Sequence, residues 1–284
     1  MISVITPTYN CANYVKRSYC CLRLQSTEDW EWIVVNDGST DKTSDIFKEI
    51  CKNDSRVKYS NLDVNRGRGF ARDFALKKAT GDIVVIWDID DLYTSDRLST
   101  IKTAIDSGFD FFCSYALLAD NNLDLKGARH FNFDSKIMPG FVHPTLAIKK
   151  DVIDKFNLGY NPSMRAGEDL EIMMQLYLSH KGYYCEEYLM IYAEDREVNL
   201  SKAIDANKSQ LSSIRNIFSR NHDKYSLYTR MKFLSKIYLK IFILYLFYIK
   251  PSLYLKTVKY RDSQHVISKK ISMEILSLLK GNLK

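Results

Sequence analysis

One stretch, GDIVVIWDIDDLY, residues 81–93, combines the pattern of a buried strand with a cluster of carboxylates. Its apolar residues 83–87 indicate a buried strand, and three carboxylates, Asp88, Asp90 and Asp91, follow directly. Carboxylates this close repel one another, and each is costly to dehydrate unless a proton, a cation or a donor compensates it. One Asp after a strand is an ordinary turn or cap residue. Three after so apolar a strand favour a site for a positive group.

Earlier segments alternate between strand and helix patterns. Short apolar runs at 3–9, 30–37 and 56–61 predict strands, and apolar residues at helical spacing predict helices at 40–54 and 69–80. Strands that alternate with helices are typical of a parallel, doubly wound sheet, so we predict the α/β class with a mostly parallel sheet. Ligands of such sheets bind beyond the carboxyl ends of the strands, where Asp37 and the three later carboxylates fall.

The chain continues with mixed elements beyond this stretch. We predict a helix at 97–108, a strand at 109–118, loops with an irregular strand at 120–140, a strand leading into a helix at 141–156, and a helix at 166–182. The first turn of that last helix holds Glu168 and Asp169, which suit a helix N-terminus on dipole grounds alone.

The bulk composition indicates a globular protein in a reducing compartment. The chain has 284 residues, 46% of them hydrophobic, enough for one large domain with an appendage. Its six cysteines form no CxxC pair and have no regular spacing, so we expect reduced thiols in the cytosol rather than zinc ligands or disulfides. The N-terminus lacks the pattern of a signal peptide.

The charge is divided unevenly between a body and a tail. Residues 206–284 hold 16 Lys and Arg against 3 Asp and Glu, whereas residues 1–205 hold 25 against 31. We therefore predict a domain over 1–205 and a basic amphipathic helical tail over 206–284. Aliphatic and aromatic residues within the tail favour an anionic membrane or a protein partner over nucleic acid. The apolar run 237–249 is too short to span a membrane.

The acidic cluster indicates a cation of a particular kind. Oxygen ligands with no nearby His or Cys suit Mg²⁺ or Mn²⁺, which retain water and bind phosphate oxygens. The sequence thus favours a diphosphate substrate.

Six short motifs together resemble one enzyme family. VITPTYN, VVNDGSTD, NRGRGFARDFAL, WDIDD, HPT and GEDLE occur in the order and approximate spacing of family 2 glycosyltransferases with the GT-A fold. The resemblance covers roughly residues 1–200. It implies inverting, metal-dependent transfer of a sugar from a nucleotide diphosphate donor to an acceptor hydroxyl.

The resemblance also implies roles for individual residues. Thr6, Pro7 and Tyr9 would line the base and ribose pocket, Asp37 would accept a hydrogen bond from the base, and Arg72 would flank the nucleotide. Asp88 would lie near the ribose, Asp90 would be the metal ligand, and Asp91 would contact the donor sugar or the metal's waters. Asp169 would be the general base, with Glu168 holding the acceptor or the loop.

Two positions leave alternatives open. His143 either is a buried histidine satisfied by a backbone carbonyl or helps to bind the diphosphate or donor sugar. Asp73 stands where many relatives have Asn, which puts a negative charge near the nucleotide.

The sequence lacks the Q-x-x-R-W motif of processive synthases, so a single addition is expected. We predict a UDP-sugar donor, a lipid-linked saccharide acceptor in bacterial surface polysaccharide assembly, and a peripheral location at the inner face of the cytoplasmic membrane. The rival readings are a nucleotidyltransferase, which usually has a glycine-rich basic N-terminal loop that TPTYNCANY lacks, and a catalytically inactive carbohydrate- or membrane-binding module.

Overall fold

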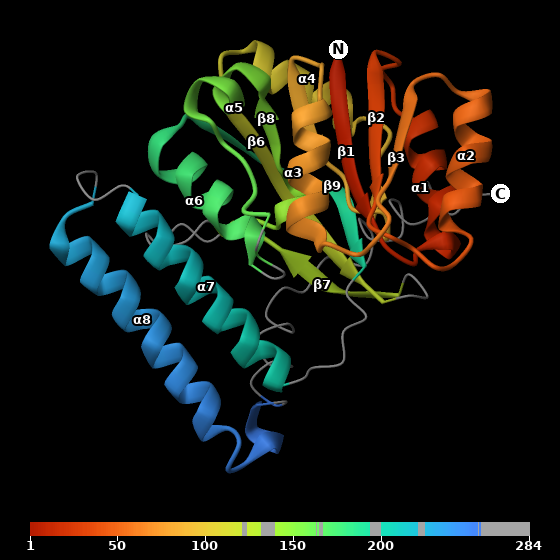
Figure 1. Cartoon of the computed structure of the whole chain (residues 1–284). Coiled ribbons are helices and arrows are strands. Elements are labelled where there is room, and N and C mark those ends of the chain that lie inside the picture. Colours follow the sequence, from red (N-terminus) through yellow and green to blue (C-terminus); the bar gives the residue numbers. More distant parts are fainter. Residues whose placement is uncertain are drawn as a thin grey trace.

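The structure of the chain is a computed structural model. It describes residues 1–120, 124–131, 140–162, 164, 167–193, 200–220, 225–254 and 256. These residues form a sheet that is flanked by helices, with two long helices packed against one side (Figure 1).

The first half of the chain builds four neighbouring parallel strands. In order across the sheet they are β3 (Val57–Asn61), β2 (Trp30–Asn36), β1 (Ile2–Thr8) and β4 (Ile83–Ile86). The connecting helices are α1 (Ala12–Arg23), α2 (Thr43–Asn53) and α3 (Arg68–Lys78). All residues of β2 and β4 are buried, since helices cover both faces, and this explains their mostly apolar sequences. The predicted strands and the two predicted helices are confirmed; α1 was not anticipated.

The second half adds strands of both directions. The elements are β5 (Leu92–Tyr93), α4 (Arg97–Asp106), β6 (Phe111–Ala119), β7 (Leu125–Arg129), the 3₁₀ turn η1 (His143–Thr145), β8 (Ala147–Lys149), α5 (Lys150–Phe156), α6 (Glu168–Ser179) and β9 (Gly182–Ala193). The sheet order is β3-β2-β1-β4-β8-β6-β9-β5, with β7 paired to β6. β9 is parallel to β6, whereas β8, β7 and β5 join antiparallel. The α/β class is confirmed, and the parallel order is continuous only from β3 to β4.

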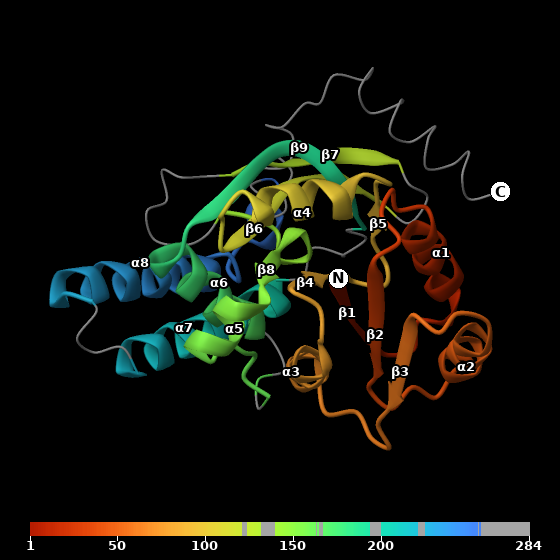
Figure 2. The same cartoon turned by 90° about the horizontal axis from the view of Figure 1, so that it is seen from above.

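Helices lie on both faces of the sheet (Figure 2), and each face has its own apolar core. On one face, α1, α2 and α4 pack around Trp32, Phe47 and Trp87. On the other, α3, α5 and α6 pack around Ile5, Ile86 and other strand residues. The six cysteines, all in the described part, are free thiols, as the sequence predicts.

A helical pair, α7 (Leu200–Arg220) and α8 (Leu227–Leu246), lies beside α6 (Figure 1). A third apolar cluster joins them, with Leu170 and Met174 from α6 against residues of α7 such as Ile214, and Phe233 and Ile237 from α8. The predicted boundary between residues 205 and 206 falls inside α7. Within the described residues, no helix is long and apolar enough to cross a membrane. Most of the predicted tail beyond residue 254 lies outside the described residues.

Candidate active site

A cavity of about 420 Å³ opens at the carboxyl ends of β1, β2 and β4. Because these strands are parallel, the residues that follow them meet at one edge of the sheet. The lining residues are Pro7, Thr8, Tyr9, Asp37, Asn65, Gly67, Arg68, Arg72, Asp88, Ile89 and Asp90. Six of the residues that the sequence predicts for the site are therefore brought together here.

Asp37 holds the loop that leads into α3. Its carboxylate oxygens accept hydrogen bonds from the backbone N–H groups of Arg66 at 2.7 Å and Gly67 at 2.8 Å. Gly67 has φ of +94°, which L side chains rarely adopt, so glycine suits this turn. Gly69 is needed for another reason: a Cβ there would lie 2.7 Å from the carbonyl oxygen of Met164. The two glycines let α3 begin at the cavity and pack closely against the segment before α6.

The three carboxylates after β4 have different surroundings. Arg72 Nη2 donates to both oxygens of Asp88, at 2.8 and 3.0 Å. Burial opposes ionisation of Asp88, but Arg72 outweighs it and holds the pKa of that carboxyl below its usual range. Asp90 lines the cavity, and its backbone oxygen accepts a hydrogen bond from Arg17 Nη2 at 2.7 Å. Part of the positive charge that the acidic cluster requires is thus supplied by the chain itself.

Asp91 and Thr6 lie away from the cavity, although the resemblance implied donor contacts for both. Asp91 is 1% exposed and its Oδ1 accepts from the backbone N–H of Ala193, at the end of β9. Burial and the neighbouring Asp90 and Asp88 raise the pKa of Asp91 well above its usual range. Thr6 is fully buried, and its Oγ1 accepts from Trp32 Nε1. Thr6 points into the core from β1, whereas Asp91 lies between β4 and β5 and bonds to the backbone at the end of β9.

Arg72 links the acidic cluster to the first turn of α6. Its Nη1 donates to Glu168 Oε1 at 2.6 Å, and Arg68 Nε lies 2.9 Å from the same oxygen. Glu168 is 1% exposed, and burial raises its pKa while Arg72 and Arg68 oppose that rise. Asp169 is more exposed, and within the described part of the chain no group donates a hydrogen bond to its carboxylate. The two adjacent acids therefore have different surroundings: two arginines contact Glu168, whereas the carboxylate of Asp169 is more exposed.

His143 is buried between this network and Tyr160. Its Nε2 lies 3.0 Å from the Tyr160 hydroxyl, and its Nδ1 has no hydrogen-bond partner among the described residues. The commoner alternative, a histidine satisfied by a backbone carbonyl, is not what the described contacts show. The sequence did not predict Tyr160 as the partner of His143, since nothing in the local pattern relates it to a histidine 17 residues earlier.

We expect the imidazole of His143 to be neutral at pH 7. Burial and the nearby Arg72 lower its pKa from 6.5 to about 4. Since the unfolded chain binds this proton more readily, the folded state should lose stability as the pH falls from about 6.5 towards 4. Imidazole ¹⁵N chemical shifts measured by NMR across a pH series test this, with Tyr160→Phe as the variant that should alter the tautomer populations. Titration of folded His143 near 6.5 would contradict the expectation.

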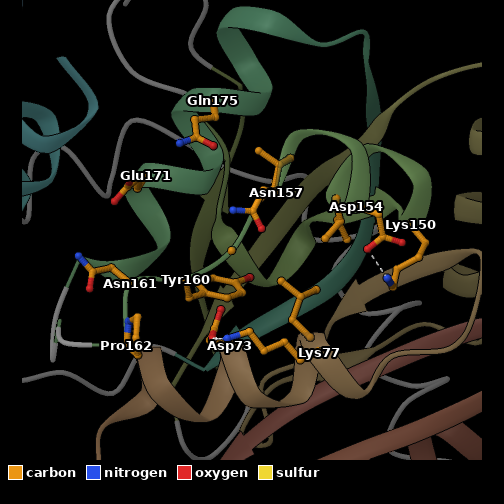
Figure 3. Close-up of a pocket in the computed structure, with 14 residues that line it drawn as sticks. Asp73, Lys77, Lys150, Asp154, Asn157, Tyr160, Asn161, Pro162, Glu171 and Gln175 are labelled. Carbon is orange, nitrogen blue, oxygen red and sulfur yellow. Dashed lines mark hydrogen bonds and ion pairs between the residues drawn. The ribbon is translucent and has the colours of Figure 1, made fainter. Parts of the chain in front are cut away.

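A second cavity, of about 520 Å³, lies between α3, α5 and α6 (Figure 3). Its charged residues are largely paired with one another: Lys77 with Asp73, at 2.7 Å, and Lys150 with Asp154. Asp73 thus lines this cavity rather than the one at the acidic cluster, so its charge is turned away from the expected nucleotide. Tyr160 lines this cavity too, while its hydroxyl bonds to His143.

The sequence and its relatives identify the family. A family model described as "Glycosyl transferase family 2" matches residues 3–166. TuaG of Bacillus subtilis, a glycosyltransferase named for teichuronic acid biosynthesis, is 31% identical over 73% of this chain and 82% of its own. WfgD of Escherichia coli, named as a UDP-Glc:alpha-D-GlcNAc-diphosphoundecaprenol beta-1,3-glucosyltransferase, is 29% identical over 43% of this chain and 49% of its own.

Solved structures share the fold. TarS of S. aureus in complex with UDP-GlcNAc has a TM-score of 0.68 and 23% identity, over 83% of this chain and 71% of its own. The mannosyltransferase PcManGT of Pyrobaculum calidifontis, in complex with GDP-Man and Mn²⁺, has a TM-score of 0.63 and 17% identity, over 99% and 84%. The predicted GT-A type of fold is confirmed by these likenesses.

Proposed function

Because the chain belongs to glycosyltransferase family 2, we propose that it transfers one sugar, with inversion, from a nucleotide diphosphate to a glycan acceptor. The expected donor is UDP-linked, and the expected product is part of a surface polysaccharide, the kind of pathway for which the similar TuaG is named. The observation that carries the proposal is the contact of one buried arginine, Arg72, with both Asp88 and Glu168. It connects the acidic cluster to the first turn of α6.

The donor occupies the cavity at the strand ends in this proposal. The ring of Tyr9 is 50% exposed, which suits stacking on a base, with Pro7 and Asp37 beside it. Arg72 and Asp88 lie further in, beside Asp90, and His143 is near enough to Arg72 for that charge to lower its pKa. We assign the nucleotide to the Tyr9 side and the diphosphate to the Asp90 side.

The acceptor is assigned to the side of α6. Displacement with inversion needs a base on the face of the sugar opposite to the leaving diphosphate, and the base must reach the acceptor hydroxyl. Asp169 is the proposed general base, because its carboxylate is accessible. Glu168 is a positioning residue, because two arginines hold it in place.

The donor set suits Mn²⁺ or Mg²⁺. Asp90 offers hard carboxylate oxygens to the cavity, next to the Asp88 carboxylate that Arg72 holds. No group of three or more His, Cys, Asp or Glu side chains able to hold a metal occurs in the part of the chain that the structure describes. Mg²⁺ commonly binds through one or two carboxylates plus substrate phosphates. We propose that Asp90 holds such a cation together with the donor, where it would neutralise the leaving diphosphate.

The proposed acceptor is a lipid-linked saccharide at the inner face of the cytoplasmic membrane. Support comes from the name of WfgD, whose acceptor is a diphosphoundecaprenol-linked sugar, and from the basic apolar tail of this chain. The tail would keep the enzyme peripheral to the membrane in which the acceptor is anchored.

A donor panel tests this function. UDP, GDP and CDP and their common sugar conjugates are offered with Mn²⁺ and with a chelator, and the melting temperature is recorded, because a ligand of the native state raises it by mass action. The sugar conjugate that gives the largest shift then enters a transfer assay with lipid-diphosphate saccharides. Absence of a shift with every nucleotide, in folded protein, would contradict the proposal.

Replacing Asp90 by Ala should abolish metal-dependent binding of the donor. The substitution removes the carboxylate that is proposed to join the protein to the cation, while Asp88 stays paired with Arg72. Calorimetric titration with UDP and Mn²⁺ measures the effect. Asp106→Ala, at an exposed carboxylate on α4, is the matched control and should bind like the wild type. An affinity of Asp90→Ala equal to that of the wild type would refute the assignment.

A further inference from the structure

Helix α8 has a second apolar face, opposite to the one that packs on α7. Phe233, Ile237, Ile241 and Leu244 are buried on the inner side. The outer face is the set of exposed residues Leu227, Tyr228, Met231, Tyr238, Leu239, Phe242, Ile243, Tyr245 and Leu246. Met231, Leu239 and Phe242 are 61%, 57% and 59% exposed. Apolar side chains this exposed, gathered along one helix, indicate an interaction surface.

Basic residues border this outer face on both sides. Lys232, Lys236 and Lys240 recur at every fourth residue, so they form one row along the helix. On the opposite border, α7 supplies two cations that contact tyrosines of the outer face. Arg215 donates a hydrogen bond to the Tyr238 hydroxyl, and Lys208 lies 5.6 Å from the centre of the Tyr245 ring. Residues 227–246 contain no Asp or Glu, so every charged side chain of α8 is cationic.

A groove continues the outer face at the end of the helical pair. It has a volume of about 270 Å³ and is lined by Phe218, Leu227, Met231 and Leu234, with Arg215, Arg230 and Ser219 beside them. The combination of an apolar floor and guanidinium groups suits an acyl chain near an anionic headgroup.

We propose that the outer face of α8 docks on the surface of an anionic lipid bilayer, with the helix lying in the plane of the interface. The proposal rests on the membrane-linked acceptor of the proposed function and specifies the surface that makes the contact. The apolar residues enter the boundary between headgroups and acyl chains, and the two basic borders meet lipid phosphates.

A bilayer fits this face better than a second copy of the chain. A twofold dimer would place the same face against itself, so that the basic rows of two helices that contain no Asp or Glu would be brought together. A bilayer with anionic lipids supplies negative charge along the whole length of the helix.

Docking of α8 also connects the membrane to the catalytic region. Helix α7 lies between α8 and α6 (Figure 1). Ser213 of α7 donates to the carbonyl oxygen of Gly167, the residue before Glu168 and Asp169. The position of the proposed base relative to the bilayer is therefore set through direct packing. For the same reason, deletion of residues 206–284 would expose Leu170 and Met174 and would be a poor test of membrane binding.

Sedimentation of the full chain with vesicles tests the proposal. Binding is expected to vesicles that contain phosphatidylglycerol and not to pure phosphatidylcholine. Changing Lys232 and Lys236 together to Glu should weaken binding roughly 30-fold or more, because each lysine near an anionic surface contributes about 1 kcal/mol. Lys48 and Lys52, also four residues apart and exposed, lie on α2 at the far side of the sheet, and the same exchange there is the matched control.

Fluorescence of Phe242→Trp tests which face makes the contact. The three native tryptophans are buried, so the added one reports on the outer face. Its emission should shift to the blue with anionic vesicles. The proposal would be overturned if the emission of Phe242→Trp did not shift although the protein bound vesicles. It would also be overturned if both charge-exchange variants lost vesicle binding equally, or if the chain formed a concentration-independent dimer that covers the outer face. These readouts need no substrate. Absence of a melting-temperature shift with every nucleotide would instead count against the proposed function.

Discussion

Asp169→Asn should lower kcat for sugar transfer about 10²–10⁴-fold, the range usual for loss of a general base, and should leave donor affinity unchanged. The reason is the difference between two neighbouring acids. Glu168 is buried against Arg72 and Arg68, whereas Asp169 is more exposed and accepts no hydrogen bond from any described group. Asn keeps the size and polarity of the side chain but cannot accept the proton of the acceptor hydroxyl.

The measurement separates catalysis from binding. Single-turnover transfer gives the rate, and calorimetry with UDP and Mn²⁺ gives the donor affinity of the same variant. Asp154→Asn, at an exposed carboxylate on α5, serves as the control and should match the wild type in both. A kcat of Asp169→Asn within a few-fold of the wild type would remove Asp169 from the role of base.

Arg72→Met should lower the free energy of unfolding by about 3–5 kcal/mol at pH 7, the usual cost of breaking a buried ion pair from one side. Arg72 is 4% exposed and contacts two carboxylates, of which Glu168 is 1% exposed. Methionine fills much of the volume but compensates neither charge. Because the same arginine links the acidic cluster to α6, loss of transfer activity should accompany the loss of stability.

The loss of unfolding free energy in Arg72→Met should be smaller at acid pH, and two pKa shifts give the direction of this change. Arg72 holds the pKa of Asp88 below its unfolded value, so this stabilisation is present above pH 3.8 and disappears as the pH falls. Burial raises the pKa of Glu168 above 4.5, and without Arg72 it should rise further, so protonation relieves the buried charge as the pH falls. Both effects make the variant least stable, relative to the wild type, at neutral pH.

Urea unfolding of the variant at neutral and acid pH measures this difference. Arg72→Met combined with Glu168→Gln should recover part of the loss, since the second change removes the uncompensated charge. Arg66→Met is the control: Arg66 stacks over Phe70 at the surface, and its loss should change the unfolding free energy by less than about 1 kcal/mol. A small or pH-independent loss in Arg72→Met would show that the buried network contributes little.

Much of the fold follows from the sequence because its strands are buried on both faces. In the sequence, β1, β2 and β4 are visible as apolar runs and α2 and α3 as periodic patterns, whereas α1 was not anticipated. β9, a strand of 12 residues, was missed: Glu186 and Glu187 in its middle divide its apolar residues into two runs, 183–185 and 188–193. Its pairing with β6, about 70 residues earlier, depends on contacts that no local pattern records.

The candidate site, too, was predicted in part from the sequence and depends in part on the tertiary structure. By itself the sequence determined that Asp37, Asp88 and Asp90 would meet at one edge, because residues that follow parallel strands lie at the same edge of the sheet. Only the tertiary structure decided that Arg72 joins Asp88 to Glu168, that Tyr160 partners His143, and that Asp91 turns towards β9. Periodicity reports which face of an element is buried. The choice of partner for a charged side chain depends on segments far apart in the chain, and it is made by packing and by the cost of leaving a charge unpaired.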